Sequence, residues 1–159
     1  MGRLLPLILG LTLAVPSRAG ETAVLVGPCF GPLRQPPRRA FGSLEVDHRL
    51  DDSCFGLWGT FDFTTDGDHF VGAGPSVTWS PGGRWLLAGS SGPGYYLRQS
   101  GFDLGCTLEF RSTFYVAHRI GRGGWAGVSY SHYSNGGLRK HNPGAETMRL
   151  FWAIPFARR

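Results

Sequence analysis

Apolar and polar side chains alternate along several segments of this chain, and this alternation limits the possible folds more than any other feature. Residues 104–119 have Cys106, Leu108, Phe110, Ser112, Phe114 and Val116 at even positions, and Thr107, Glu109, Arg111, Thr113 and Tyr115 at odd positions. Residues 54–63 set Phe55, Leu57, Phe61 and Phe63 against Trp58, Thr60 and Asp62. Successive side chains of a strand point to opposite faces. Each segment is therefore predicted to be a strand with one apolar and one polar face.

Similar segments recur between short clusters of Gly, Pro, Asp and Ser, which are typical of turns. Strands are expected near residues 22–30, 40–49, 54–63, 69–79, 84–97, 104–119, 124–135 and 145–156. The first is the weakest prediction, because the proline-rich stretch Pro32–Arg39 follows it. About eight antiparallel strands close into the smallest usual transmembrane barrel. The predicted fold class is all-β, an eight-stranded antiparallel transmembrane β-barrel.

The alternation fits two kinds of barrel. An apolar exterior around a polar interior is typical of a membrane barrel. A soluble barrel would turn the apolar face inward and leave Asp62, Glu109 and Arg111 in water. No later stretch has the length and apolarity of a membrane-spanning helix, so a membrane form of this chain has to be a closed barrel. The sequence pattern alone leaves both forms open.

The first residues resemble a cleaved export signal. Met1-Gly2-Arg3 is short and positive, Leu4–Val15 is almost uninterruptedly apolar, and Ser17-Arg18-Ala19 has the Ser-x-Ala pattern of a cleavage site. The apolar run is shorter than the roughly 20 residues of a membrane-spanning helix. We expect residues 1–19 to be a signal peptide and residues 20–159 to be one outer-membrane β-barrel domain.

The net charge indicates which kinds of partner this chain is expected to bind. The formal net charge of +5 falls to +3 when Arg3 and Arg18 leave with the signal, an excess that suits an anionic lipid surface. An exported chain without a basic-aromatic motif is not expected to bind nucleic acid.

The chain has three cysteines, Cys29, Cys54 and Cys106. Because this number is odd, one stays unpaired, and which two could pair is left open. No Cys-x-x-Cys or tight ligand spacing suggests a metal site, and we assign no catalytic role to a cysteine.

The segment Ser131–Glu146, with the sequence SHYSNGGLRKHNPGAE, carries the candidate chemistry. His132 and Ser134 are two residues apart on one expected strand, so they share a face. A hairpin to the last strand would bring Glu146 beside them, giving a nucleophile, a base and an acid that orients the base. Asn135 and Gly137 are candidates for stabilising an oxyanion. The spacing alone also allows a reading without catalysis, since His-x-Ser pairs occur by chance and Asn-Gly-Gly is an ordinary turn.

The same segment resembles a known family. The run His132-Tyr133-Ser134-Asn135-Gly136-Gly137, followed by Asn142-x-Gly144-x-Glu146, is similar to the motif of the PagL-type lipid A 3-O-deacylases. The resemblance implies an eight-stranded outer-membrane barrel that hydrolyses the ester-linked 3-hydroxyacyl chain at position 3 of lipid A without a metal or other cofactor. It implies that Ser134 is the nucleophile, His132 the base and Glu146 its orienter, on the lipid-facing surface. Asn135 and Gly137 would line the oxyanion site.

Two other functions remain open at this stage. One is a non-enzymatic outer-membrane barrel with a structural or adhesive role. The other is a soluble exported barrel that binds a small apolar ligand inside. The leading expectation has lipid A, or lipopolysaccharide, as substrate and the outer membrane as location. The sequence does not decide whether the protein is a monomer or a homodimer.

Overall fold

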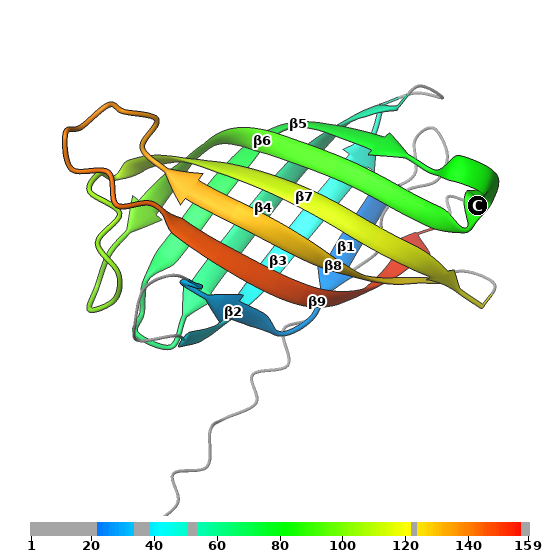
Figure 1. Ribbon diagram of the computed structural model, residues 1–159, viewed down its shortest axis with the longest axis horizontal. Helices are drawn as coiled ribbons and strands as arrows, with labels where there is room; N and C mark the ends of the chain where they lie inside the picture. Colours follow the sequence, from blue (N-terminus) through cyan, green and yellow to red (C-terminus); the bar gives the residue numbers. More distant parts are fainter. Residues whose placement is uncertain (1–21, 34–38, 51–53, 122–123, 157–159) are drawn as a thin grey trace, which may run out of the picture.

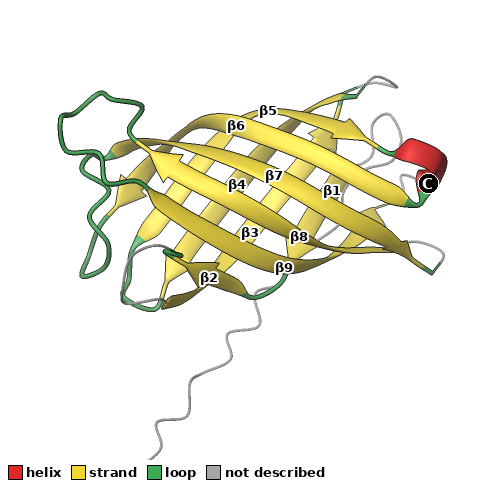
Figure 2. Ribbon diagram, in the orientation of Figure 1, coloured by secondary structure: helices red, strands yellow, loops and turns green. Residues whose placement is uncertain are grey.

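The chain is described from a computed structural model that covers residues 22–33, 39–50, 54–121 and 124–156. The expected signal peptide, residues 1–19, lies outside these ranges. The strands are β1 (Thr22–Val26), β2 (Cys29–Gly31), β3 (Arg39–Arg49), β4 (Phe55–Thr64), β5 (His69–Trp79), β6 (Trp85–Leu97), β7 (Leu108–Ile120), β8 (Gly124–Ser134) and β9 (Ala145–Phe156). One short 3-10 helix, η1 (Pro81–Gly83), precedes β6. Strands make up most of the described chain (Figure 2).

The strands form a closed antiparallel barrel (Figure 1). From β3 to β9 each strand pairs with the next one along the chain. Both β1 and β2 lie between β3 and β9, so together they fill one position in the wall and close it. The eight-stranded antiparallel barrel predicted from the alternation is confirmed.

Two strands differ from the sequence prediction by more than a residue or two at one end. The first strand, expected over residues 22–30, is interrupted between Val26 and Cys29. Pro28 has no amide hydrogen to donate to the ladder, and Gly27 lies so close to β9 that a Cβ there would be 1.5 Å from the Leu150 carbonyl oxygen. The strand expected over residues 104–119 begins only at Leu108, because Gly105 has a φ of +91°, outside the extended region.

The two ends of the barrel differ. The long connections, residues 98–107 and 135–144, lie at the same end. The short connection from β5 to β6 lies at the other end, with the end of β7, the start of β8, the start of β1 and the end of β9. Outer-membrane barrels have short periplasmic turns and longer extracellular loops. The end with residues 98–107 and 135–144 therefore corresponds to the extracellular side of such a barrel.

The barrel turns its polar face inward, as the membrane form of the prediction requires. Glu45 and Arg111 are 1% and 2% exposed, whereas Leu57 and Phe114 are 51% and 54% exposed. A water-soluble barrel would bury such apolar side chains. Within the described residues no helix has the length and apolarity to cross a membrane.

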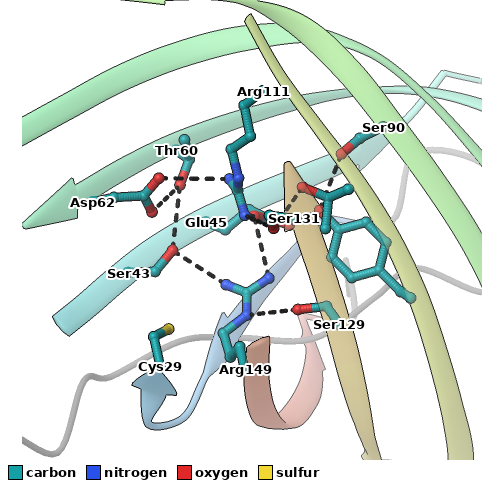
Figure 3. Close-up of polar contacts among 12 residues, drawn as sticks. Cys29, Ser43, Glu45, Thr60, Asp62, Ser90, Arg111, Ser129, Ser131 and Arg149 are labelled. Carbon is teal, nitrogen blue, oxygen red and sulfur yellow. Dashed lines mark hydrogen bonds and ion pairs between the residues drawn. The ribbon is translucent and has the colours of Figure 1, made fainter. Parts of the chain in front are cut away.

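Charged groups inside the barrel form what we call the Glu45 cluster, which consists of Glu45, Asp62, Arg111 and Arg149 (Figure 3). The Glu45 carboxylate accepts hydrogen bonds from Arg149 at 3.2 Å and from Tyr115, and lies 2.7 Å from an Arg111 nitrogen. These residues come from β3, β4, β7 and β9. The cluster therefore joins strands that are far apart around the barrel.

Arginine on the outer surface should separate a membrane barrel from a soluble one. Leu150, in the middle of β9, and Leu138, in the 135–144 loop, are 53% and 56% exposed. We expect Leu150→Arg to destabilise the barrel by about 2–4 kcal/mol in lipid vesicles, because a strand centre lies near the bilayer midplane. Leu138→Arg should change stability by less than about 0.5 kcal/mol. Urea unfolding followed by tryptophan fluorescence measures both, and equal effects would contradict a lipid-facing outer surface.

Candidate active site

The hairpin of β8 and β9 places the three residues proposed for chemistry on one outer face, with His132 and Glu146 in contact. His132 on β8 lies directly opposite Glu146 on β9, and Ser134 ends β8 on the same face as His132. Between them Tyr133 points inward, where its hydroxyl donates a 2.8 Å hydrogen bond to Asp62 of the Glu45 cluster. This internal contact fixes the rotation of β8, so His132 and Ser134 lie on the outer surface.

The imidazole of His132 is oriented toward the acid. Its Nδ1 lies 3.7 Å from Glu146 Oε1, an ion-pair distance that is longer than a hydrogen bond. The side chain of His132 is 46% exposed and that of Glu146 is 13% exposed. Gly144 lies beside the ring: a Cβ there would be 3.2 Å from His132 Cε1, and its φ is +64°. Because glycine has no side chain, the imidazole ring fits beside this position.

The loop after Ser134 is held by Asn135, which is fully buried. Its side-chain nitrogen donates to the His141 carbonyl at 2.8 Å, and its side-chain oxygen accepts from the Gly137 amide at 3.0 Å. Its own backbone amide donates to the Asn142 side chain at 3.1 Å. The backbone amides of Asn135 and Gly137 therefore both have partners inside the loop.

Asn142 and Gly144 were part of the sequence motif but had no assigned role. In the structure Asn142 accepts the first amide of the loop, and Gly144 makes room for the His132 ring. Their place in the motif was the feature of the sequence that could have pointed to a role for both residues. Their contacts depend on how the loop folds back over the end of β8, which spacing does not specify.

A second loop supports the first. The buried Asp68 carboxylate accepts hydrogen bonds from the backbone amides of Gln99, Gly101 and Phe102. These contacts fix residues 98–107 over the end of the barrel. Gly105 of this segment approaches the 135–144 loop so closely that a Cβ would lie 2.1 Å from the His141 carbonyl oxygen. The two loops therefore pack against each other next to Ser134.

The cysteines form no disulfide with one another, and the potential metal ligands of the described residues form no cluster. Cys29, Cys54 and Cys106 are all free thiols. Among the described residues, no group of three or more His, Cys, Asp or Glu side chains could hold a metal ion.

A closed antiparallel barrel with a charged interior and an apolar exterior defines a class, the outer-membrane-type β-barrel. The sequence also matches a family within that class. Residues 44–155 match the family described as lipid A 3-O-deacylase (PagL). The match spans most of the chain, so this protein belongs to the PagL family of lipid A deacylases.

Solved structures are similar in fold. A de novo designed transmembrane β-barrel superposes with a TM-score of 0.62 at 9% sequence identity, covering 89% of this chain and all of the design. The outer-membrane protein Ail of Yersinia pestis, solved in a phospholipid bilayer nanodisc, gives a TM-score of 0.56 at 13% identity, with 86% of this chain and 99% of Ail covered. At such identities the likeness concerns the fold alone. No curated protein matches the sequence.

Proposed function

We propose that this protein hydrolyses the ester-linked 3-hydroxyacyl chain at position 3 of lipid A, with Ser134 as nucleophile, His132 as base and Glu146 as orienting acid. The observation that carries the proposal is the direct pairing of His132 with Glu146 on the outer surface, with Ser134 on the same face. Ionisable side chains on a lipid-facing surface are costly and mark functional sites by default. A hydrolase whose substrate stays in the bilayer needs its site on that surface.

The reaction proceeds in two halves. Ser134 Oγ attacks the ester carbonyl carbon while His132 Nε2 takes the hydroxyl proton, and Glu146 stabilises the resulting imidazolium. Collapse of the tetrahedral intermediate breaks the bond to the sugar O3, which receives the proton from His132. Water then attacks the acyl-serine, with His132 again taking and returning a proton. The products are the free hydroxy acid and lipid A with a free 3-hydroxyl.

The oxyanion would be stabilised by Asn135 and Gly137. The Asn135 side-chain nitrogen has two N–H groups and uses one of them on the His141 carbonyl. The Gly137 amide donates to Asn135 Oδ1, so its use requires exchange of that partner for the substrate oxygen. Hydrogen bonds of this kind are often longer or differently paired before substrate binds.

Other parts of the substrate have suitable partners nearby. Arg139 and Lys140 are exposed in the same loop and carry positive charge for lipid A phosphates. The acyl chains would remain against the apolar outer wall of the barrel. Because the barrel closes within one chain, the proposal needs no second copy.

The test is expression of the full precursor in a Gram-negative host that lacks this activity, followed by mass spectrometry of its lipid A. The proposed function predicts loss of one 3-hydroxyacyl chain. Heat-modifiable gel migration shows whether the barrel has folded. A folded barrel in the outer membrane with unchanged lipid A would favour a non-enzymatic role instead.

Removal of the orienting acid should slow the reaction without abolishing it. We expect Glu146→Ala to lower kcat by about 10²–10⁴-fold, because the imidazole loses its orientation and the partner of its positive charge. Glu146→Gln, which keeps the size but not the charge, should also be impaired. Release of hydroxy acid from purified lipid A in detergent micelles gives both rates. Full activity of Glu146→Ala would exclude the acid's role.

A further inference from the structure

Basic side chains gather at the end of the barrel opposite to the candidate active site. Arg84 immediately precedes β6, and His118 and Arg119 lie near the end of β7. All three side chains are exposed. The short connection from β5 to β6 is at this end of the barrel (Figure 1), which corresponds to the periplasmic side. We call Arg84, His118 and Arg119 the periplasmic basic patch.

The two arginines of the patch face each other across neighbouring strands. Trp85 pairs with His118, and one position further toward the periplasmic end the Arg119 amide donates to the Arg84 carbonyl at 2.8 Å. Residues opposite each other in this way have Cβ atoms about 4.5–5.5 Å apart, and like charges there are destabilising. No acidic side chain of the described residues forms an ion pair with either arginine. An anion bound between them would offset the repulsion.

The patch has the hydrogen-bond donors that a phosphate group requires. Arginine presents five N–H donors in a planar fork, and two of them can bind one phosphate in parallel. The Arg119 guanidinium lies over the Trp125 ring, 5.9 Å from its centroid, a contact that uses the face of the guanidinium and not its N–H groups. His118 adds an N–H donor in either protonation state. The patch therefore combines positive charge with several donors.

Two tryptophans place the patch at the membrane surface. Trp85 packs against His118 with ring centroids 4.8 Å apart. On the other side of His118, Ala126 pairs with both His118 and Trp152. Trp85 and Trp152 are 52% and 50% exposed on the outward face, and tryptophan is enriched where a membrane meets water. His118 therefore lies at the level of the lipid headgroups in the periplasmic leaflet.

This position favours a lipid over a soluble anion. Arg84 and Arg119 are chain neighbours of Trp85 and His118, so their long side chains can extend from the barrel rim toward a phosphate beside His118. Arginine side chains commonly lie along apolar surface in this way while the guanidinium stays in water. The acyl chains of the same lipid would pack against the apolar outer wall of the barrel.

We propose that Arg84, His118 and Arg119 bind the phosphate of an anionic phospholipid in the periplasmic leaflet. The site is separate from the candidate active site and does not depend on the proposed function. Phosphatidylglycerol should bind more tightly than phosphatidylcholine, whose choline cation offsets its phosphate. Each basic residue near an anionic lipid surface contributes a factor of about five in affinity. The expected preference for phosphatidylglycerol is therefore at least about tenfold in Kd.

The test is native mass spectrometry of the purified protein in a polyoxyethylene detergent, which carries no phosphate. Phosphatidylglycerol and phosphatidylcholine with identical acyl chains are titrated separately, and the fraction of protein with one bound lipid gives each Kd. We expect the wild type to prefer phosphatidylglycerol and Arg84→Gln/Arg119→Gln to bind both lipids about equally. Arg84→Lys/Arg119→Lys, which keeps the charge, should retain most of the preference.

A matched control separates this site from a general effect of net charge. Arg139→Gln/Lys140→Gln removes the same charge from the 135–144 loop at the other end of the barrel, and it should keep the preference of the wild type. Loss of the preference in this control to the same extent as in Arg84→Gln/Arg119→Gln would contradict a localised site.

Unfolding by urea in vesicles checks that the variant folds and measures the same binding independently. In pure phosphatidylcholine, Arg84→Gln/Arg119→Gln should unfold at the same or a higher urea concentration than the wild type, because the repulsion between the arginines is gone. Addition of phosphatidylglycerol should raise the midpoint of the wild type more than that of the variant, since a ligand of the folded state stabilises it. Equal increases would overturn the proposal.

A last measurement distinguishes a lipid from a free phosphate ion. Excess inorganic phosphate should not displace bound phosphatidylglycerol, because the ion lacks the acyl chains that pack on the barrel wall. Displacement by inorganic phosphate, or equal Kd values of the wild type for the two lipids, would overturn the proposal. Lipid A deacylation by Arg84→Gln/Arg119→Gln in detergent micelles should equal that of the wild type, so the outcome for the active site is independent.

Discussion

Ser134→Ala is expected to lower kcat for lipid A deacylation by at least about 10³-fold. Alanine removes the oxygen that attacks the ester, while His132 and Glu146 remain paired across the hairpin. Only the contribution of substrate binding and oxyanion stabilisation would be left. In cells, the lipid A of the variant strain should have the same mass as that of the host without the gene.

The variant must be shown to fold before loss of activity is assigned to chemistry. Ser134 is the last residue of β8 and is partly buried on the outer face, so its substitution should leave urea unfolding nearly unchanged. Ser129→Ala is a matched control, because it removes a serine hydroxyl from the same strand on the inner face, where it contacts Arg149. Ser129→Ala should keep lipid A deacylation, and full activity of Ser134→Ala would show that another nucleophile acts.

Glu45→Ala is expected to destabilise the barrel by about 3–5 kcal/mol, because it leaves two buried guanidinium groups without their shared carboxylate. Arg111 and Arg149 both contact Glu45 Oε2, at 2.7 and 3.2 Å, and both are at most 3% exposed. A closed barrel has no room for these side chains to reach water without opening a seam between strands. The expected results are unfolding at lower urea and poor assembly in the outer membrane.

Two comparisons test the cause of this effect. Thr113→Ala removes a neutral buried hydrogen bond to Ser131 inside the same barrel and should cost about 1 kcal/mol. Glu45→Gln keeps the size of the side chain but removes its charge and should fall between the two. An unfolding midpoint of Glu45→Ala equal to that of Thr113→Ala would mean that the arginines find other partners.

Strand positions and faces could be predicted because they depend on local sequence. The period of two in residues 54–63 and 104–119 already separates Leu57 and Phe114 from Asp62 and Arg111. Phe110 and Ser112 are likewise predicted to share the face of Phe114. Proline and glycine set limits that the alternation does not describe, and for this reason Gly27-Pro28 interrupts the first strand and Gly105 delays the start of β7.

The candidate site could be predicted from the sequence only in part. That His132 and Ser134 share a face follows from their spacing on one strand. Whether Glu146 joins them depends on the register of β8 with β9, because a slip of one residue would turn Glu146 into the barrel interior. The register that pairs His132 with Glu146 is fixed by the ladder of the whole hairpin and by the loop contacts of Asn135 and Asn142.

Sequence by itself thus determined the strands, their two faces and the pairing of a serine with a histidine on one of them, because these are properties of neighbouring residues. Only the tertiary structure decided which face lies outside and which distant charges meet inside. Glu45 and Arg149 are 104 residues apart in the chain and still form a hydrogen bond. Such contacts depend on closure of the barrel, which no local pattern encodes.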